Sequence, residues 1–166
     1  MNTTSSFRCI AAILASCLWS QSPAAAAVAE KLGVRITITS ECKLAAASEL
    51  YFGSHGVLDT NVEKTGQINV QCTTGTPYNV GLDAGIGAGA TVAARKMTGT
   101  KTGTIDYNLY RDANHNDVWG TTIGKDTLSA TGDGATQSIN VYGLVLPQVT
   151  PAPGDYTDTV AITVNY

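Results

Sequence analysis

The sequence predicts an all-β sandwich that lacks one of its own strands, and three observations lead to this prediction. Short segments with apolar residues at every second position recur along the chain, and turn-forming residues separate them. One further segment of this kind, residues 31–39, stands near the front. The last segment ends at Tyr166, with no strand after it.

The front of the 166-residue chain is typical of a secretory signal peptide. Arg8 supplies a positive charge, residues 9–19 are apolar but too few to cross a bilayer, and residues 24–29 offer small side chains for cleavage. We therefore expect residues 1–27 to be a leader, cut between about 25 and 29. The protein would be exported.

Residues 28–41 follow the leader and contain an amphipathic strand pattern. Leu32, Val34, Ile36 and Ile38 fall on alternate positions, with charged and polar residues between most of them. This is the period of a β-strand with one apolar face. The segment predicts a strand that needs an apolar surface to cover it.

Residues 42–166 are predicted to form the sandwich itself. Its alternating segments are 66–72, 77–84, 104–110, 138–146 and 156–166, the fourth turning at Gly143. Turn residues occupy 53–56, 73–76, 112–117, 132–134 and 147–154. Residues 45–50 could form one helical turn at most, and we expect no other helix outside the leader.

The count of strands leaves the sandwich incomplete. About six segments follow Cys42, whereas an immunoglobulin-type sandwich has about seven strands. A sandwich one strand short would expose an apolar groove and unpaired backbone edges. The segment 28–41 of another copy could fill this gap, or the chain could fold its own segment back; periodicity alone favours neither.

The cysteines predict one disulfide. Cys9 and Cys17 leave with the leader, so Cys42 and Cys72 remain, 30 positions apart. Two cysteines in an exported chain indicate a disulfide, which contributes about 3–4 kcal/mol in the chain-entropy model. No ligand-spaced histidine or cysteine stands nearby, so we expect no metal site.

Charge and residue content argue against several function classes. Without Arg8 the chain has 9 basic and 13 acidic residues and no basic cluster, which is unfavourable for nucleic-acid binding. The only histidines, His55 and His115, lie in turn-like segments with no nucleophile to serve. We expect no catalytic residue, no cofactor and no enzyme activity.

Three local patterns suggest more specific functions, but each has weak support. Asp112, Asn114 and Asn116 resemble the start of a calcium loop, but Asp117 and Ile123 replace its glycine and glutamate, which favours a polar turn. Residues 85–89 have alternate glycines without the spacing of a phosphate loop. Trp119, with Tyr107 and Tyr110 nearby, could stack on a sugar, although core packing explains these aromatic residues more simply.

A set of motifs along the whole mature chain resembles one family. The motifs are the alternating strand that ends at Cys42, INVQC at 68–72, GTPYNVGLDAG at 75–85, RKM at 95–97, IDYNLYRDANHNDVWG at 105–120, VYGLVLPQ at 141–148 and GDYTDTVAITVNY at 154–166. In their order and spacing they resemble the spore coat protein U domain, whose members include pilin subunits of archaic chaperone–usher pili. The ANHN stretch at 113–116 is more polar than the family pattern.

The resemblance implies a pilus subunit that assembles by donor-strand exchange, for surface attachment and biofilm formation. Its partners would be a periplasmic chaperone, an outer-membrane usher and other copies of itself or related pilins, at the cell surface. The single-domain length is similar to that of a stem subunit. Alternatives are a secreted coat protein that does not polymerise and a glycan-binding adhesin of the same fold.

The resemblance also assigns residues to the two sides of the exchange. The donor positions would be Leu32, Val34, Ile36 and Ile38, with Val28 added if cleavage spares it. The edge of the acceptor groove would carry Val160, Ile162, Val164 and Tyr166. These roles are expectations for the structure to place.

Overall fold

The structure, a computed structural model, describes residues 26–101 and 103–166. The chain divides into two units, Met1–Ile36 and Thr37–Tyr166, and every strand belongs to the second unit. Within the described ranges there is no helix, and hence none that could span a membrane. The predicted all-β class is confirmed, whereas nearly all of the predicted leader, 1–27, lies outside the described residues.

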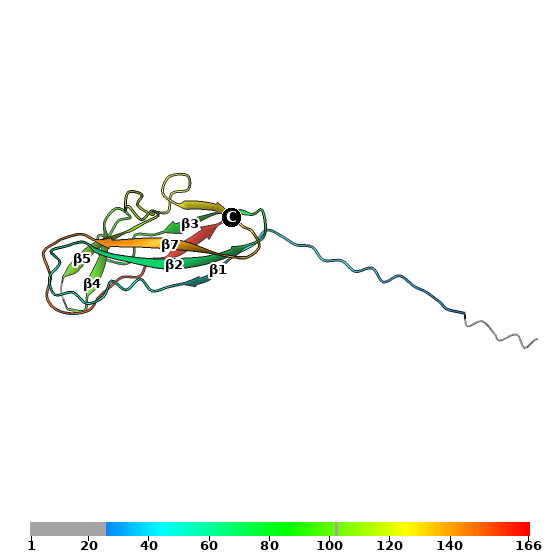
Figure 1. Cartoon of the computed structure of the whole chain (residues 1–166), viewed down its shortest axis with the longest axis horizontal. Coiled ribbons are helices and arrows are strands. Elements are labelled where there is room, and N and C mark those ends of the chain that lie inside the picture. Colours follow the sequence, from blue (N-terminus) through cyan, green and yellow to red (C-terminus); the bar gives the residue numbers. More distant parts are fainter. Residues whose placement is uncertain (1–25, 102) are drawn as a thin grey trace, which may run out of the picture. The chain divides into compact units, whose positions relative to one another are not determined.

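Nine strands make up the described part of the second unit (Figure 1). They are β1 (Cys42–Ala47), β2 (Val62–Cys72), β3 (Pro77–Leu82), β4 (Arg95–Gly99), β5 (Thr104–Tyr110), β6 (Leu128–Thr131), β7 (Thr136–Val145), β8 (Tyr156–Thr157) and β9 (Ile162–Asn165). They form two antiparallel sheets, one of six strands in the order β1-β2-β7-β5-β4-β8 and one of three in the order β6-β3-β9.

The core lies between these sheets because each sheet buries one face. The longest pairing joins β2 to β7, from Val62 opposite Val145 to Gln71 opposite Thr136, and Figure 1 shows these two strands side by side. Alternate residues of the strands point inward, as their period of two requires. Buried examples from three strands are Ile68, Val70, Tyr78, Val80, Leu82, Ile139 and Val141.

The last predicted segment, 156–166, forms two strands rather than one. β8 pairs with β4 in the six-stranded sheet, whereas β9 pairs with β3 in the three-stranded sheet. The chain therefore crosses from one sheet to the other between Thr157 and Ile162. A continuous strand cannot make this change of sheet, which is why an alternation that runs unbroken in the sequence is interrupted in the fold.

Other elements also differ from the prediction. Residues 45–47 belong to β1 and not to a helical turn, and β7 continues through Gly143 where a turn was expected. The strands β4 and β6 were not predicted. In β4 the fully buried residue is the charged Arg95, where a strand pattern would have an apolar residue. β6 is a four-residue edge strand that is only half-buried on one face.

Candidate functional site: an apolar groove between the sheets

A groove of about 810 Å³ opens into the space between the two sheets. Its floor is apolar and comes from both sheets, including Ile68 of β2, Val141 of β7 and Leu82 of β3, which are all buried. Residues 47–56 form one wall and residues 150–158 form the other. A concave site with an apolar floor is the usual form of a binding site, and its volume is within the range of known pockets.

The groove adjoins two strands that have a free edge. Within the described residues, β1 pairs only with β2 and β9 pairs only with β3, so neither strand has a hydrogen-bonded partner along its other edge. Ala47 at the end of β1 and Ile162 at the start of β9 both line the groove. Free strand edges present unpaired N–H and C=O groups, and another strand can pair with them.

The wall at 47–56 is held against the sheet by one short polar link and two apolar side chains. The Ser48 N–H donates to the Gln67 carbonyl (2.9 Å), and the Gln67 N–H donates to Ser48 Oγ (2.7 Å). Leu50 and Phe52 are half-buried and pack against Gly143, where a Cβ would lie only 2.8 Å from Leu50 Cδ2. This wall was not predicted from the sequence, although the apolar residues at 50 and 52 alternate as they would in a strand.

The wall at 150–158 is tied to the rest of the fold by hydrogen bonds. Leu58 donates its N–H to Thr150 Oγ1 (2.8 Å), and the Leu58 carbonyl accepts from the Gln148 N–H (2.9 Å). Further along, Tyr156 Oη donates to the Ala152 carbonyl (2.7 Å). These bonds fix the entrance of the groove on that side.

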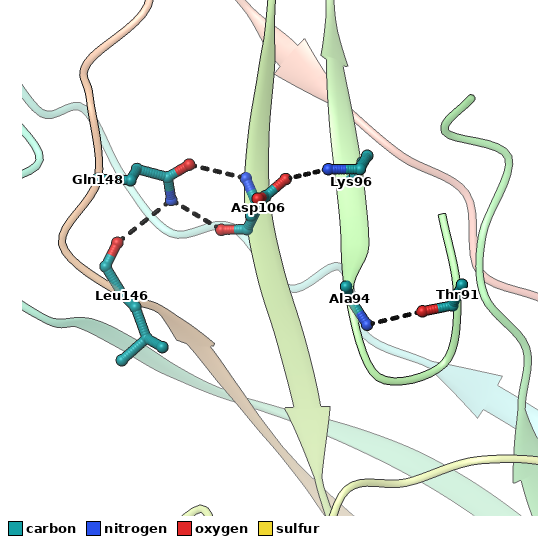
Figure 2. A network of polar contacts seen from close by, with 6 residues as sticks. All are labelled: Thr91, Ala94, Lys96, Asp106, Leu146 and Gln148. Atoms are coloured by element: carbon teal, nitrogen blue, oxygen red, sulfur yellow. Dashed lines mark hydrogen bonds and ion pairs between the residues drawn. The ribbon is translucent and has the colours of Figure 1, made fainter. Parts of the chain in front are cut away.

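The Gln148 side chain acts as a short substitute for a neighbouring strand (Figure 2). Its Oε1 accepts from the Asp106 N–H (2.9 Å), and its Nε2 donates to the Asp106 carbonyl (2.8 Å). The regular pairing of β5 with β7 begins only at Asn108 opposite Leu144, so Gln148 extends this contact along β5. Figure 2 also shows Lys96 Nζ of β4 paired with the Asp106 carboxylate, at 2.6 Å.

A carboxylate beside the groove holds the segment that leads into β9. Tyr107 Oη donates to Asp158 Oδ2 (2.8 Å), and Asp158 Oδ1 accepts from the Ile86 N–H (2.8 Å). Burial, and then the hydrogen bond to Asp158, raise the pKa of Tyr107 well above its ordinary value, so this phenol keeps its proton. Asp83 Oδ1 accepts from the Ala161 N–H (2.9 Å), which anchors the same segment a second time.

Arg95 is the central polar anchor of this end of the sandwich. Its guanidinium is fully buried, and burial lowers its pKa through the loss of hydration. Five hydrogen bonds compensate: Arg95 donates to the carbonyls of Asp83, Val92, Leu82 and Trp119 and to Asn108 Oδ1. Because these acceptors belong to β3, β5 and two loops, one side chain joins the parts of both sheets that support the groove.

The predicted acceptor residues fall partly on the groove. Val160, Ile162 and Val164 are half-buried and pack against the core. Val160 and Ile162 line the groove, whereas Val164 does not, and Tyr166 also lies outside the lining and is 62% exposed. The groove therefore adjoins the first half of the predicted edge.

The predicted donor residues lie in a stretch without regular structure. No strand is assigned to residues 26–40. The side chains of Leu32, Val34 and Ile36 are 83–89% exposed, Ile38 is 72% exposed, and Val28 is 90% exposed. Because these apolar side chains are in contact with water, they contribute no hydrophobic burial energy here. Their role as donor residues stays a prediction.

The predicted disulfide is confirmed. Cys42 and Cys72 are bonded, with a sulfur–sulfur distance of 2.02 Å, and they face each other in the register of β1 and β2. The bond attaches the first residue of β1 to the end of a central strand. It therefore marks where the sandwich begins after the N-terminal segment.

The loop at 112–117 is a self-capped turn. The Asp112 carboxylate accepts from the N–H groups of Asn114, Asn116 and Asp117, and the Asp117 bond is the main cause of the lowered pKa of Asp112. These bonds hold the carboxylate within the loop, as expected for a polar turn. No group of three or more ligand-type side chains suited to a metal occurs in the described ranges.

Trp119 belongs to the core. It is completely buried, and its Nε1–H donates to the Val80 carbonyl (2.8 Å). Tyr107 is also buried, so neither ring is available to stack on a sugar. Core packing, the simpler interpretation from the sequence, is the one that the structure supports for these two residues.

Comparison with known proteins gives a family and a fold. The model of the Spore Coat Protein U domain matches residues 28–163. "Protein U" of Myxococcus xanthus is 31% identical over 160 residues, which cover 87% of this chain and 89% of that protein.

Solved structures resemble the fold at lower identity. A chain in the CsuC–CsuE chaperone–tip adhesion subunit pre-assembly complex, from archaic chaperone-usher Csu pili of Acinetobacter baumannii, matches 78% of this chain with a TM-score of 0.55 and 24% identity. This chain spans 41% of that one. The Escherichia coli Hda pilus minor tip subunit HdaB matches 75% of this chain and 79% of its own length, with a TM-score of 0.41 and 17% identity. On the family match and the identity to Protein U, the chain belongs to the Spore Coat Protein U domain family.

Proposed function

We propose that this protein is a structural subunit of a chaperone–usher pilus, and that it polymerises by donor-strand exchange. The observation that carries the proposal is an apolar groove beside two free strand edges, in a chain that also has an exposed amphipathic segment. The segment 28–41 of one copy would enter the groove of the next. The family and the fold of a Csu pilus complex support this reading.

The energy available is sufficient for a stable contact. Burial of an apolar side chain of this size contributes about 1.5–3 kcal/mol, so the four donor residues from Leu32 to Ile38 give on the order of 6–12 kcal/mol before ordering costs. Backbone pairing along β1 and β9 adds little net free energy, but it satisfies groups that would otherwise be buried unpaired.

The remaining assignments follow from this assembly. Residues 1–27 would direct export, a periplasmic chaperone would cover the groove before assembly, and an outer-membrane usher would join the subunits. The pilus would lie at the cell surface and serve attachment and biofilm formation. Among pilus subunits we propose a stem role, because residues 42–166 form one sandwich and residues 28–41 have the pattern of a donor strand. No residue set for catalysis follows from the groove, and no enzyme activity is proposed.

The test compares the mature chain with a version that starts after Ile38. Negative-stain microscopy of the mature protein should show fibres, and the shortened chain should form none. With a peptide of residues 28–40 added, the shortened chain should remain folded and monomeric. A mature protein that stays a stable monomer would support the alternative, a non-polymerising coat protein that uses its own segment.

A further inference from the structure

Charge is distributed unevenly around the groove. Its lining includes three carboxylates, those of Glu49, Asp155 and Asp158, and no lysine or arginine. Asp158 is bonded to Tyr107, whereas Glu49 and Asp155 are exposed and form no ion pair within the described ranges. Glu49 stands in the wall at 47–56 and Asp155 in the wall at 150–158. Among the described residues, each wall therefore carries one exposed carboxylate without an ion pair.

The N-terminal segment has charges of the opposite sign in a regular position. Between the apolar residues of 32–38 the alternate series begins with Lys31 and includes Arg35, and it has no acidic residue before Glu41. Successive side chains of a strand point to opposite faces. If the apolar series faces the floor of a groove, Lys31 and Arg35 face its mouth, about 13 Å apart along the strand.

The same segment limits which residues can enter. Glu30 belongs to the alternate set that contains Leu32, and Ser40 belongs to the set that contains Ile38. A carboxylate on an apolar floor would be buried without a partner, which is strongly unfavourable. The inserted series thus runs from Leu32 to Ile38, with Arg35 inside this stretch and Lys31 directly before it.

We propose that Glu49 and Asp155 recognise Lys31 and Arg35 of a second copy of this chain. This inference rests on the proposed strand exchange and adds to it a reason for choosing the chain's own segment. The pairs lie at the exposed mouth of the groove. Charges in such positions raise the rate of encounter and suppress wrong partners more than they tighten the final complex. The match therefore selects the donor and helps to fix its register.

The experiment measures the assembly rate of the full mature chain by light scattering, at low and at high salt. The donor variant Lys31→Glu with Arg35→Glu should assemble about tenfold more slowly at low salt, and the groove variant Glu49→Lys with Asp155→Lys should slow by a similar factor. Salt screens exposed charges, so both differences should shrink at high salt. The chain with all four changes should recover most of the lost rate, because its charges match again.

A matched control carries the same type of charge change away from the groove. Glu63 of β2 is exposed and does not line the groove, so Glu63→Lys should leave the rate close to that of the unchanged chain. The inference is overturned if the variant with all four changes still assembles slowly, or if Glu63→Lys slows assembly as much as the groove variant does.

A further variant separates this inference from the proposed function. Ile36→Asp should abolish assembly whatever the charges at the mouth do. If it does so while the charge variants assemble at the unchanged rate, only the charge match is wrong. If Ile36→Asp assembles normally, strand exchange itself is wrong and the charge match falls with it.

Discussion

The N-terminal segment and strand β2 carry nearly the same pattern of apolar residues in opposite environments. In β2, Ile68 and Val70 are 2% and 0% exposed, whereas Val34 and Ile36 are 89% and 83% exposed. β2 is paired along both edges, by β1 and β7, and no strand is assigned to residues 26–40. Alternation thus specifies a face that needs a cover, but it does not specify which chain supplies that cover.

The largest effects should come from the same substitution placed in each region. Val70→Asp would bury an unpaired carboxylate in the core, and we expect a loss of more than about 4 kcal/mol, enough to prevent folding. Ile36→Asp should leave the sandwich folded and abolish fibres, because the carboxylate would be buried only on insertion into another subunit. Thermal unfolding and electron microscopy separate the two outcomes.

Thr37→Asp is the matched control for the N-terminal substitution. Thr37 belongs to the outward series of the same segment, so its variant should still form fibres. If Thr37→Asp and Ile36→Asp were equally harmful, or Ile36→Asp unfolded the sandwich, the contrast between a donor face and an outer face would not hold.

The boundary between the two regions gives the second prediction. The disulfide from Cys42 to Cys72 attaches β1 at the point where the N-terminal segment ends. Replacement of both cysteines by serine should lower the free energy of unfolding by about 3–4 kcal/mol. Denaturant titration of the variant, with the oxidised unchanged chain as reference, provides the measurement. A loss below 1 kcal/mol would indicate that β1 is held by its pairing with β2 alone.

The parts of the fold that the sequence predicts are those in which local alternation decides the outcome. Residues 66–72, predicted as a strand, lie within β2, and residues 77–84, also predicted as a strand, contain β3. The disulfide was predicted because only two cysteines remain in an exported chain. β4 was not predicted because its inward-facing residue is Arg95, and the burial of Arg95 depends on carbonyl oxygens supplied by distant loops. No local pattern reveals such partners.

The candidate site was predictable to a smaller extent. Val160 and Ile162, which line the groove, were assigned to its edge through the family resemblance. The two unpaired carboxylates, Glu49 and Asp155, come from walls about a hundred positions apart in sequence, and only the tertiary fold brings those walls to one groove. Tertiary placement, not residue type, makes them candidates.

The third prediction uses a buried group beside the groove and concerns alkaline stability. The pKa of Tyr107 is raised above that of the unfolded chain, which is about 10. Above pH 10 the unfolded chain loses this proton while the folded chain keeps it, so the free energy of unfolding falls as pH rises. Tyr107→Phe removes this contribution, and at neutral pH it costs about 1 kcal/mol through the lost bond to Asp158.

Denaturant titrations at pH 7 and near pH 10.5 test this expectation. The difference in the free energy of unfolding between Tyr107→Phe and the unchanged chain should narrow at the higher pH. Burial also raises the pKa of Tyr78 and Tyr110, so the stability of both chains should still fall as the pH rises. Tyr51 is exposed, so Tyr51→Phe should follow the unchanged chain at both pH values. A constant gap for Tyr107→Phe would contradict the prediction.

The smallest expected effect concerns the wall at 47–56, which is intermediate between the two regions compared above. Leu50 and Phe52 are half-buried, and a Cβ at Gly143 would lie 2.8 Å from Leu50 Cδ2 and 2.9 Å from Phe52 Cζ. Gly143→Ala should cost about 1 kcal/mol, since these flexible side-chain ends can move, and it should speed hydrogen exchange at residues 48–52. Gly56→Ala is the control, because nothing lies within 4 Å of its added Cβ. If both variants behave alike, the wall is as weakly held as the N-terminal segment; if only Gly143→Ala has an effect, the wall belongs to the packed sandwich.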